Sequence, residues 1–171
     1  NSTIKETILD AEHLKAVENS RTNKSEFTLY SIGYEGKTVE HFTNELIGED
    51  IKVLCDVRKN ALSMKYGFSK KQLKNVVENA GIKYIHIPAL GIESDKRQQL
   101  NTKEDYDNLF QNYKLNTIPQ RDAEILELYK MFIEHKRIAL MCFEADHNFC
   151  HRSRTIEALE KKFEKEFLIK H

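Results

Sequence analysis

The sequence has no excess of charge of either sign. Its 171 residues include 27 basic and 27 acidic side chains, so the molecule as a whole exerts no long-range attraction on nucleic acid or on an acidic membrane surface. Any anion site must therefore be local. We do not expect this chain to bind nucleic acid on its own.

The sequence is also poor in cysteine and has no long hydrophobic run. Three cysteines are an odd and small number, without the dense, even spacing of a disulfide scaffold, which predicts free thiols in a reducing compartment. No apolar run approaches membrane-spanning length, and the N-terminus lacks a basic-then-apolar signal pattern. These absences predict a soluble cytoplasmic protein with no membrane partner. They indicate nothing about its oligomeric state.

What the sequence does contain, from residue 27 onward, is an alternation of short apolar runs and amphipathic stretches. Runs that are apolar at nearly every residue are typical of strands buried on both faces; they cover residues 27–32, 51–57, 84–87 and 138–143, with a last short strand at 167–169. Apolar residues at three-and-four spacing predict helices near residues 39–46, 73–80, 106–113, 120–135 and 151–163. We predict an α/β fold, with a mainly parallel sheet covered by helices on both faces.

This pattern predicts one domain, because the chain is close to the length of an ordinary single domain. Residues 27–171 form the α/β domain, and residues 1–26, whose apolar stripe is thin, form a peripheral N-terminal arm. The stretch 89–116 starts as an apolar-poor, charged loop. It is either a lid or a solvated excursion.

Polar side chains stand at the predicted strand ends, where open parallel sheets bind their ligands. Gly33 and Tyr34 follow the first strand; Gly33 permits close backbone approach, although the dinucleotide and Walker patterns are missing and a plain turn is the simpler interpretation. Asp56 and Arg58 end the second strand on a shared face. They form either a structural ion pair or a substrate contact.

The fourth strand leads into the segment with the strongest functional signal. Here a buried strand ends at Cys142 and Glu144, and a helix then opens with Cys150-His151-Arg152-Ser153. Unpaired amides and the helix dipole favour an anion at that point, with Arg152 and Ser153 as ligands. The same field is expected to lower the pKa of Cys150 and to make it the most reactive thiol.

The roles of the other three residues are less sharply indicated. Cys142 is either a second candidate nucleophile or an inert packing thiol. Glu144 is a candidate general base or a group that orients His151, itself a candidate proton carrier. We also considered a zinc site formed by Cys142, Cys150 and His151. Adjacent Cys-His lacks the paired spacing of familiar zinc sites and no fourth ligand is evident, so we predict neither metal nor cofactor.

The sequence resembles a known family in several blocks. The blocks are residues 31–38, 54–58, 67–70, 81–91 and 142–153. In order, they resemble the signature blocks of the domain-of-unknown-function family 488, over roughly residues 27 to 165. The most specific block is Cys-x-Glu, five residues, Cys-His-Arg, which corresponds here to residues 142–152.

This resemblance implies an α/β fold and marks Asp56, Arg58 and the Cys-x-Glu block as site-like positions, but it implies no reaction. The chain departs from the family at Ala61 and Met64, where members often carry Pro and Arg. A strongly basic pocket is therefore less well supported.

Two functions remain open at this stage. The first is a thiol-dependent enzyme or ligand-binding protein whose cleft holds a phosphate or another small anion. The second is a non-catalytic binding module, acting with nucleic acid or within a larger complex. Balanced charge weakens the nucleic-acid version of the second.

Overall fold

The computed structural model describes residues 26–93, 95–97, 100–164 and 167–171. The arm expected over residues 1–26 lies, apart from its last residue, outside these ranges.

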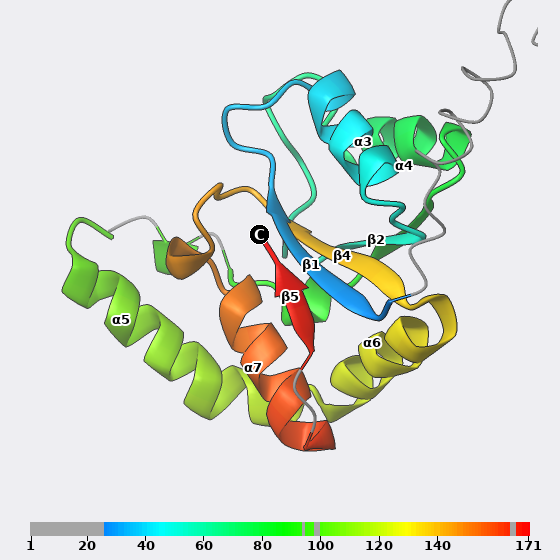
Figure 1. Cartoon of the computed structure of the whole chain (residues 1–171). Helices are drawn as coiled ribbons and strands as arrows, with labels where there is room; N and C mark the ends of the chain where they lie inside the picture. Colours follow the sequence, from blue (N-terminus) through cyan, green and yellow to red (C-terminus); the bar gives the residue numbers. More distant parts are fainter. Residues whose placement is uncertain (1–25, 94, 98–99, 165–166) are drawn as a thin grey trace, which may run out of the picture.

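The core of the described chain is a parallel sheet of five strands (Figure 1). The strands are β1 (Thr28–Gly33), β2 (Val53–Asp56), β3 (Lys83–His86), β4 (Arg137–Cys142) and β5 (Leu168–Lys170). Their order across the sheet is β3-β2-β4-β1-β5, and every neighbouring pair is parallel. The α/β fold with a parallel sheet is confirmed.

Helices cover both faces of this sheet. Figure 1 shows α3 (Val39–Gly48) and α4 (Lys70–Asn79) on one side, and α6 (Asp122–His135) and α7 (Arg152–Phe163) on the other. Alternate residues of β4 pack into the hydrophobic cores on the two faces of the sheet. Ile138, Leu140 and Cys142 join the core under α6 and α7, whereas Ala139 and Met141 join the core under α3 and α4. A strand with both faces buried must be apolar throughout, and the sequence pattern has this form.

Two of the described α-helices, α3 and α5 (Lys103–Asn112), begin at a side-chain cap. The Thr38 side chain accepts a hydrogen bond from the His41 backbone N–H at 3.2 Å and caps α3. Thr102 and Asp105 form a capping box at the start of α5. Ser69 precedes α4, but its hydroxyl donates to the Ser63 carbonyl oxygen instead of capping.

The stretch 89–116 is more ordered in secondary structure than the sequence suggested. It contains 3-10 turns at Pro88–Leu90 and Asp95–Arg97, then α5, and it leads into a π-helical turn at Tyr113–Thr117. Phe110 and Tyr113 of this stretch are buried in a small core of their own with Ile92. The stretch therefore packs against the domain, beside α7 (Figure 1).

The topology places several strand ends next to one another. From β2 the chain passes to β3, which forms the edge of the sheet. It then returns through α6, on the opposite face of the sheet from α4, to β4, which lies between β2 and β1. Ligand sites in open parallel sheets lie at such a reversal.

In the part of the chain that the structure describes, no helix combines the length and apolar character needed to cross a bilayer.

Candidate functional site

A pocket of about 220 Å³ lies at the carboxyl ends of β1, β2 and β4. Its lining comes from the loops after these strands, from the start of α7 and from the segment after β3. The lining residues are Tyr34, Arg58, Lys59, Asn60, Leu62, Ile92, Arg97, Cys142, Phe143, Glu144 and His151. Of the residues predicted from sequence, the structure thus brings Tyr34, Arg58, Cys142, Glu144 and His151 to one pocket.

Two thiols and one imidazole meet at the wall of this pocket. Cys142 is the last residue of β4, and Cys150 and His151 directly precede α7; all three side chains are buried. The His151 Nδ1 lies 4.0 Å from the Cys142 Sγ and 3.8 Å from the Cys150 Sγ. Cys142 and His151 line the pocket, whereas Cys150 lies behind them.

A hydrogen bond on the far side of the imidazole fixes its tautomer. The His151 Nε2 lies 3.1 Å from the Val57 carbonyl oxygen, which can only accept, so Nε2 carries a proton. In the neutral ring, Nδ1 is then unprotonated and its lone pair faces the two sulfurs. The ring of Tyr113 packs edge-on against the imidazole, with centroids 5.7 Å apart, and limits its movement.

The two thiols differ in acidity. The Cys150 thiol donates a hydrogen bond to the Cys142 sulfur and holds the pKa of Cys142 well below its ordinary value, helped by charge on His151 and Arg97 and opposed by burial. Burial raises the pKa of Cys150, and its contact with Cys142 raises it further. This order is the reverse of the sequence-based expectation, because Cys150 is buried behind the pocket and its pKa rises although it lies near the start of a helix.

Glu144 brings a second titratable group to the pocket. Its Oε1 accepts a hydrogen bond from Arg97, while its Oε2 is buried and has no hydrogen-bond partner among the described residues. Burial raises the pKa of Glu144, and negative charge on Cys142 raises it further, against the opposite effect of Arg97. A buried carboxyl group with a raised pKa is a candidate for proton transfer.

Asp56 and Arg58 form a buried ion pair. The Arg58 Nε donates to the Asp56 Oδ1 at 2.8 Å and the Nη2 donates to the Oδ2 at 2.6 Å, a two-pronged contact. Arg58 also donates to the Tyr34 hydroxyl at 3.0 Å, and the Tyr84 hydroxyl donates to Asp56 at 2.5 Å. Of the two alternatives left open by the sequence, the geometry shows the structural ion pair, and Arg58 at the same time forms part of the pocket wall.

Two residues predicted to bind an anion at the start of α7 lie outside the pocket lining. Arg152 is fully buried and donates to the backbone carbonyl oxygens of Ile32 and Glu144, while its Nε has no hydrogen-bond partner among the described residues. The Ser153 hydroxyl donates to the His147 carbonyl oxygen. Arg152 therefore connects β1 to the loop after β4.

Gly33 lies at the same contact between β1 and the loop after β4. A Cβ added there would lie 1.8 Å from the Glu144 carbonyl oxygen. The close approach predicted at this glycine is thus made by the protein's own backbone, which passes over Gly33 and carries Glu144 into the pocket.

Arg97, Lys59 and Ile92 are pocket residues that sequence reasoning missed. Arg97 and Ile92 belong to the segment after β3, which the sequence marked only as a charged loop. The available signal was the strand-end rule itself, because this loop also follows the carboxyl end of a strand.

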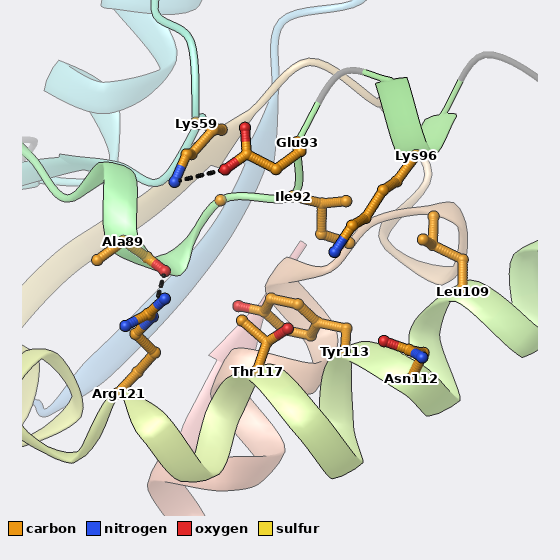
Figure 2. A pocket seen from close by; sticks show the side chains of 11 residues that line it. Lys59, Ala89, Ile92, Glu93, Lys96, Leu109, Asn112, Tyr113, Thr117 and Arg121 are labelled. Atoms are coloured by element: carbon orange, nitrogen blue, oxygen red, sulfur yellow. Dashed lines mark hydrogen bonds and ion pairs between the residues drawn. The ribbon is translucent and has the colours of Figure 1, made fainter.

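Two of these residues are shared with a smaller neighbouring hollow of about 100 Å³ (Figure 2). Lys59 and Ile92 line both. Figure 2 shows Lys59 paired with Glu93 at 2.8 Å, and Arg121 donating to the Ala89 carbonyl oxygen at 3.1 Å. Lys59, Lys96 and Arg121 thus contribute cationic side chains to the lining of this hollow.

Comparison with family models gives one match, over residues 38–159, to a model described as a domain of unknown function, DUF488. The matched range contains the whole pocket lining except Tyr34. Searches of curated proteins and of solved structures found no match.

Proposed function

The chain belongs to the DUF488 family of domains of unknown function, and from this premise we propose that its pocket binds a small anionic ligand and uses Cys142 as a thiol nucleophile. This assigns the leading chemical role to Cys142 rather than to Cys150. His151 serves as the proton carrier.

The observation that carries the proposal is the contact between the Cys142 Sγ and the His151 Nδ1 at the pocket wall. Because the Val57 carbonyl oxygen fixes the proton on Nε2, Nδ1 is free to take the thiol proton. A nucleophile, a base in contact with it and a third group that orients the base are the arrangement that nucleophilic catalysis requires.

The proposed step runs as follows. The Cys142 thiol transfers its proton to the His151 Nδ1, and the sulfur attacks an acyl carbon or a phosphorus atom of the ligand. The new bond to sulfur forms as the bond to the leaving group breaks, and the leaving group takes the proton from Nδ1. Glu144, whose pKa burial raises, stands beside this path as a second group able to give or take a proton.

The preference for an anion rests on the charges of the lining. Arg58, Lys59 and Arg97 are cationic, and Glu144 is the carboxylate that faces them. Each cation already has one carboxylate partner, in Asp56, Glu93 and Glu144 respectively, so the formal charges of the three pairs balance. The preference for an anion rests on the lining alone, which contains three cations and one carboxylate. A compact anion such as a phosphate or carboxylate group suits a pocket of about 220 Å³.

Alkylation with iodoacetamide followed by peptide mapping tests the nucleophile. In the native, metal-free protein at neutral pH we expect Cys142 to be modified first, and inorganic phosphate to slow the modification. His151→Asn should lower the rate, because the variant lacks the base. Cys55→Ala is the matched control, since it removes a buried thiol outside the cluster and leaves Cys142, Cys150 and His151 unchanged.

If Cys142 is modified only after unfolding, the thiol role is wrong and the alternative function, a non-catalytic binding module, takes its place.

The three free thiols are suited to a reducing compartment, and we propose the cytoplasm as the location on that ground.

A further inference from the structure

We propose that Cys142, Cys150 and His151 form a binding site for a thiophilic divalent ion such as Zn²⁺. This site goes beyond the proposed function and competes with it, because both need the Cys142 sulfur. The two sulfurs and the His151 Nδ1 all lie within 4.8 Å of one another.

The distances are close to those of a formed site. Tetrahedral zinc, with bonds of about 2.3 Å to sulfur and about 2.0 Å to nitrogen, holds its sulfur and nitrogen ligands roughly 3.5 Å apart. Here the two sulfur–nitrogen distances are 4.0 Å and 3.8 Å. Small rotations of the thiol side chains bring all three donors to bonding distance, with no change in the backbone.

The imidazole is already oriented as metal-binding histidines are. Its Nε2–H donates to the Val57 carbonyl oxygen at 3.1 Å, which fixes the tautomer and leaves the Nδ1 lone pair facing the sulfurs. Such a hydrogen bond from the distal nitrogen is the usual outer partner of a ligating histidine. The sequence suggested this set of three residues, but their spacing argued against a metal site, because Cys142 meets Cys150 and His151 only when the chain folds.

The chemistry of the donors selects the ion. Two thiolates and a neutral imidazole carry two negative charges, which a divalent cation neutralises in a buried setting where unpaired charge is costly. Thiolate and imidazole favour zinc and similar ions over Mg²⁺ or Ca²⁺, which prefer oxygen.

The fourth coordination position faces the pocket. Cys142, His151 and Glu144 all line it, and the buried Glu144 Oε2 lacks a hydrogen-bond partner among the described residues. Three protein ligands and one open position are the arrangement of catalytic rather than structural zinc sites. The ion would thus be reachable by a ligand in the pocket, and while bound it would keep Cys142 from acting as a nucleophile.

The test is a titration of the reduced, metal-free full chain with Co²⁺. We expect one ion per chain, with the thiolate-to-cobalt charge-transfer band and the intense d–d bands of tetrahedral coordination, both lost on addition of Zn²⁺. Cys150→Ala should weaken binding by about tenfold or more, the loss that removal of an outer partner alone can cause. Cys55→Ala, which removes the buried thiol outside the cluster, should bind as the wild type does.

A cobalt spectrum without thiolate charge transfer, or one that Cys150→Ala leaves unchanged, would overturn the site; the wild-type spectrum alone decides if a variant does not fold. The two proposals fail separately. Tetrahedral cobalt in a protein whose metal-free Cys142 resists iodoacetamide keeps the metal site and removes the nucleophile. Rapid alkylation of Cys142 in a protein that gives no thiolate–cobalt band keeps the nucleophile and removes the metal site.

Discussion

At the scale of single residues, the Arg58 guanidinium links several parts of the pocket wall. It donates to the Asp56 carboxylate, to the Tyr34 hydroxyl and to the Phe68 carbonyl oxygen. Asp56 ends β2, Tyr34 follows β1 and Phe68 precedes α4, so one side chain holds the loop after β1 to both ends of the β2–α4 loop. Burial without such partners would be prohibitive for a charged group.

Replacing Arg58 by Met should therefore destabilise the fold. The change leaves the Asp56 carboxylate, which is fully buried, without its counter-charge, and the loss of an ion-pair partner at a buried site costs about 3–5 kcal/mol. Urea unfolding measures the loss.

Lys59→Met is the matched control for Arg58→Met. It lies next along the chain, lines the same pocket and pairs with Glu93, but its side chain is 35% exposed. Its cost should stay within about 1 kcal/mol. Equal losses in the two variants would show that Arg58 does not hold the loops.

At the scale of elements, the Tyr113 hydroxyl is one of the groups that join the segment from β3 to α6 to α7. The Tyr113 hydroxyl donates to the Leu90 carbonyl oxygen at 2.7 Å and lies 3.1 Å from the Thr155 Oγ1 of α7. Because Ile92 and Arg97 of this segment form pocket wall, the contact supports one side of the pocket.

Tyr113→Phe should lower the free energy of unfolding by about 1 kcal/mol, the usual net contribution of a hydrogen bond. Amide hydrogen exchange over residues 88–97 should become faster at the same time, because the Leu90 carbonyl loses its partner. Tyr106→Phe is the control: this ring also belongs to the small core around Phe110. Similar exchange in the two variants would refute the role of the Tyr113 hydroxyl.

The helices and strands were largely predictable from the sequence, whereas the order of the strands in the sheet was not. The run at 138–143 predicted β4 because both of its faces are covered. Its place between β1 and β2 depends on packing between distant segments, and that place decides which loops meet. Arg152 illustrates the limit, since an arginine in the first turn of a helix suggests a solvent-facing charge, but the neighbouring loops enclose it completely.

At the scale of the whole molecule, several buried acids make stability depend on alkaline pH. Burial raises the pKa of Cys55 from 9.0 to about 12. Burial also raises the pKa of Tyr30, Tyr84 and Tyr113 above the ordinary 10.0. A raised folded-state pKa gives stability that is complete below the unfolded-state value and is lost as the pH rises through the folded-state value.

The free energy of unfolding should therefore fall above about pH 9, by at most about 1.4 kcal/mol per pH unit for each group. Urea unfolding at increasing pH measures the slope. Tyr84→Phe should reduce it, while Tyr66→Phe, at an exposed ring, should not. A flat profile to about pH 11 would contradict the prediction.

The balance of 27 basic and 27 acidic residues leads to a second whole-molecule prediction. The chain alone should show no appreciable binding to duplex DNA at physiological salt, because a local group of cations releases few counterions. Fluorescence anisotropy with a labelled duplex measures this. Tight binding that weakens steeply with salt would be evidence for a nucleic-acid partner.

The strand order also governs how the protein can fold while it is being synthesised. β1 pairs with β4 and β5, and Thr28 lies 109 residues before its contact Arg137. On the ribosome, β1 must therefore wait, unpaired and apolar, until most of the chain has emerged, whereas β2 and β3 can pair early. Sheets whose paired strands are distant in the sequence form slowly and expose unpaired, aggregation-prone strand edges before they are complete. A nascent chain stalled before residue 137 should therefore be a substrate for chaperones.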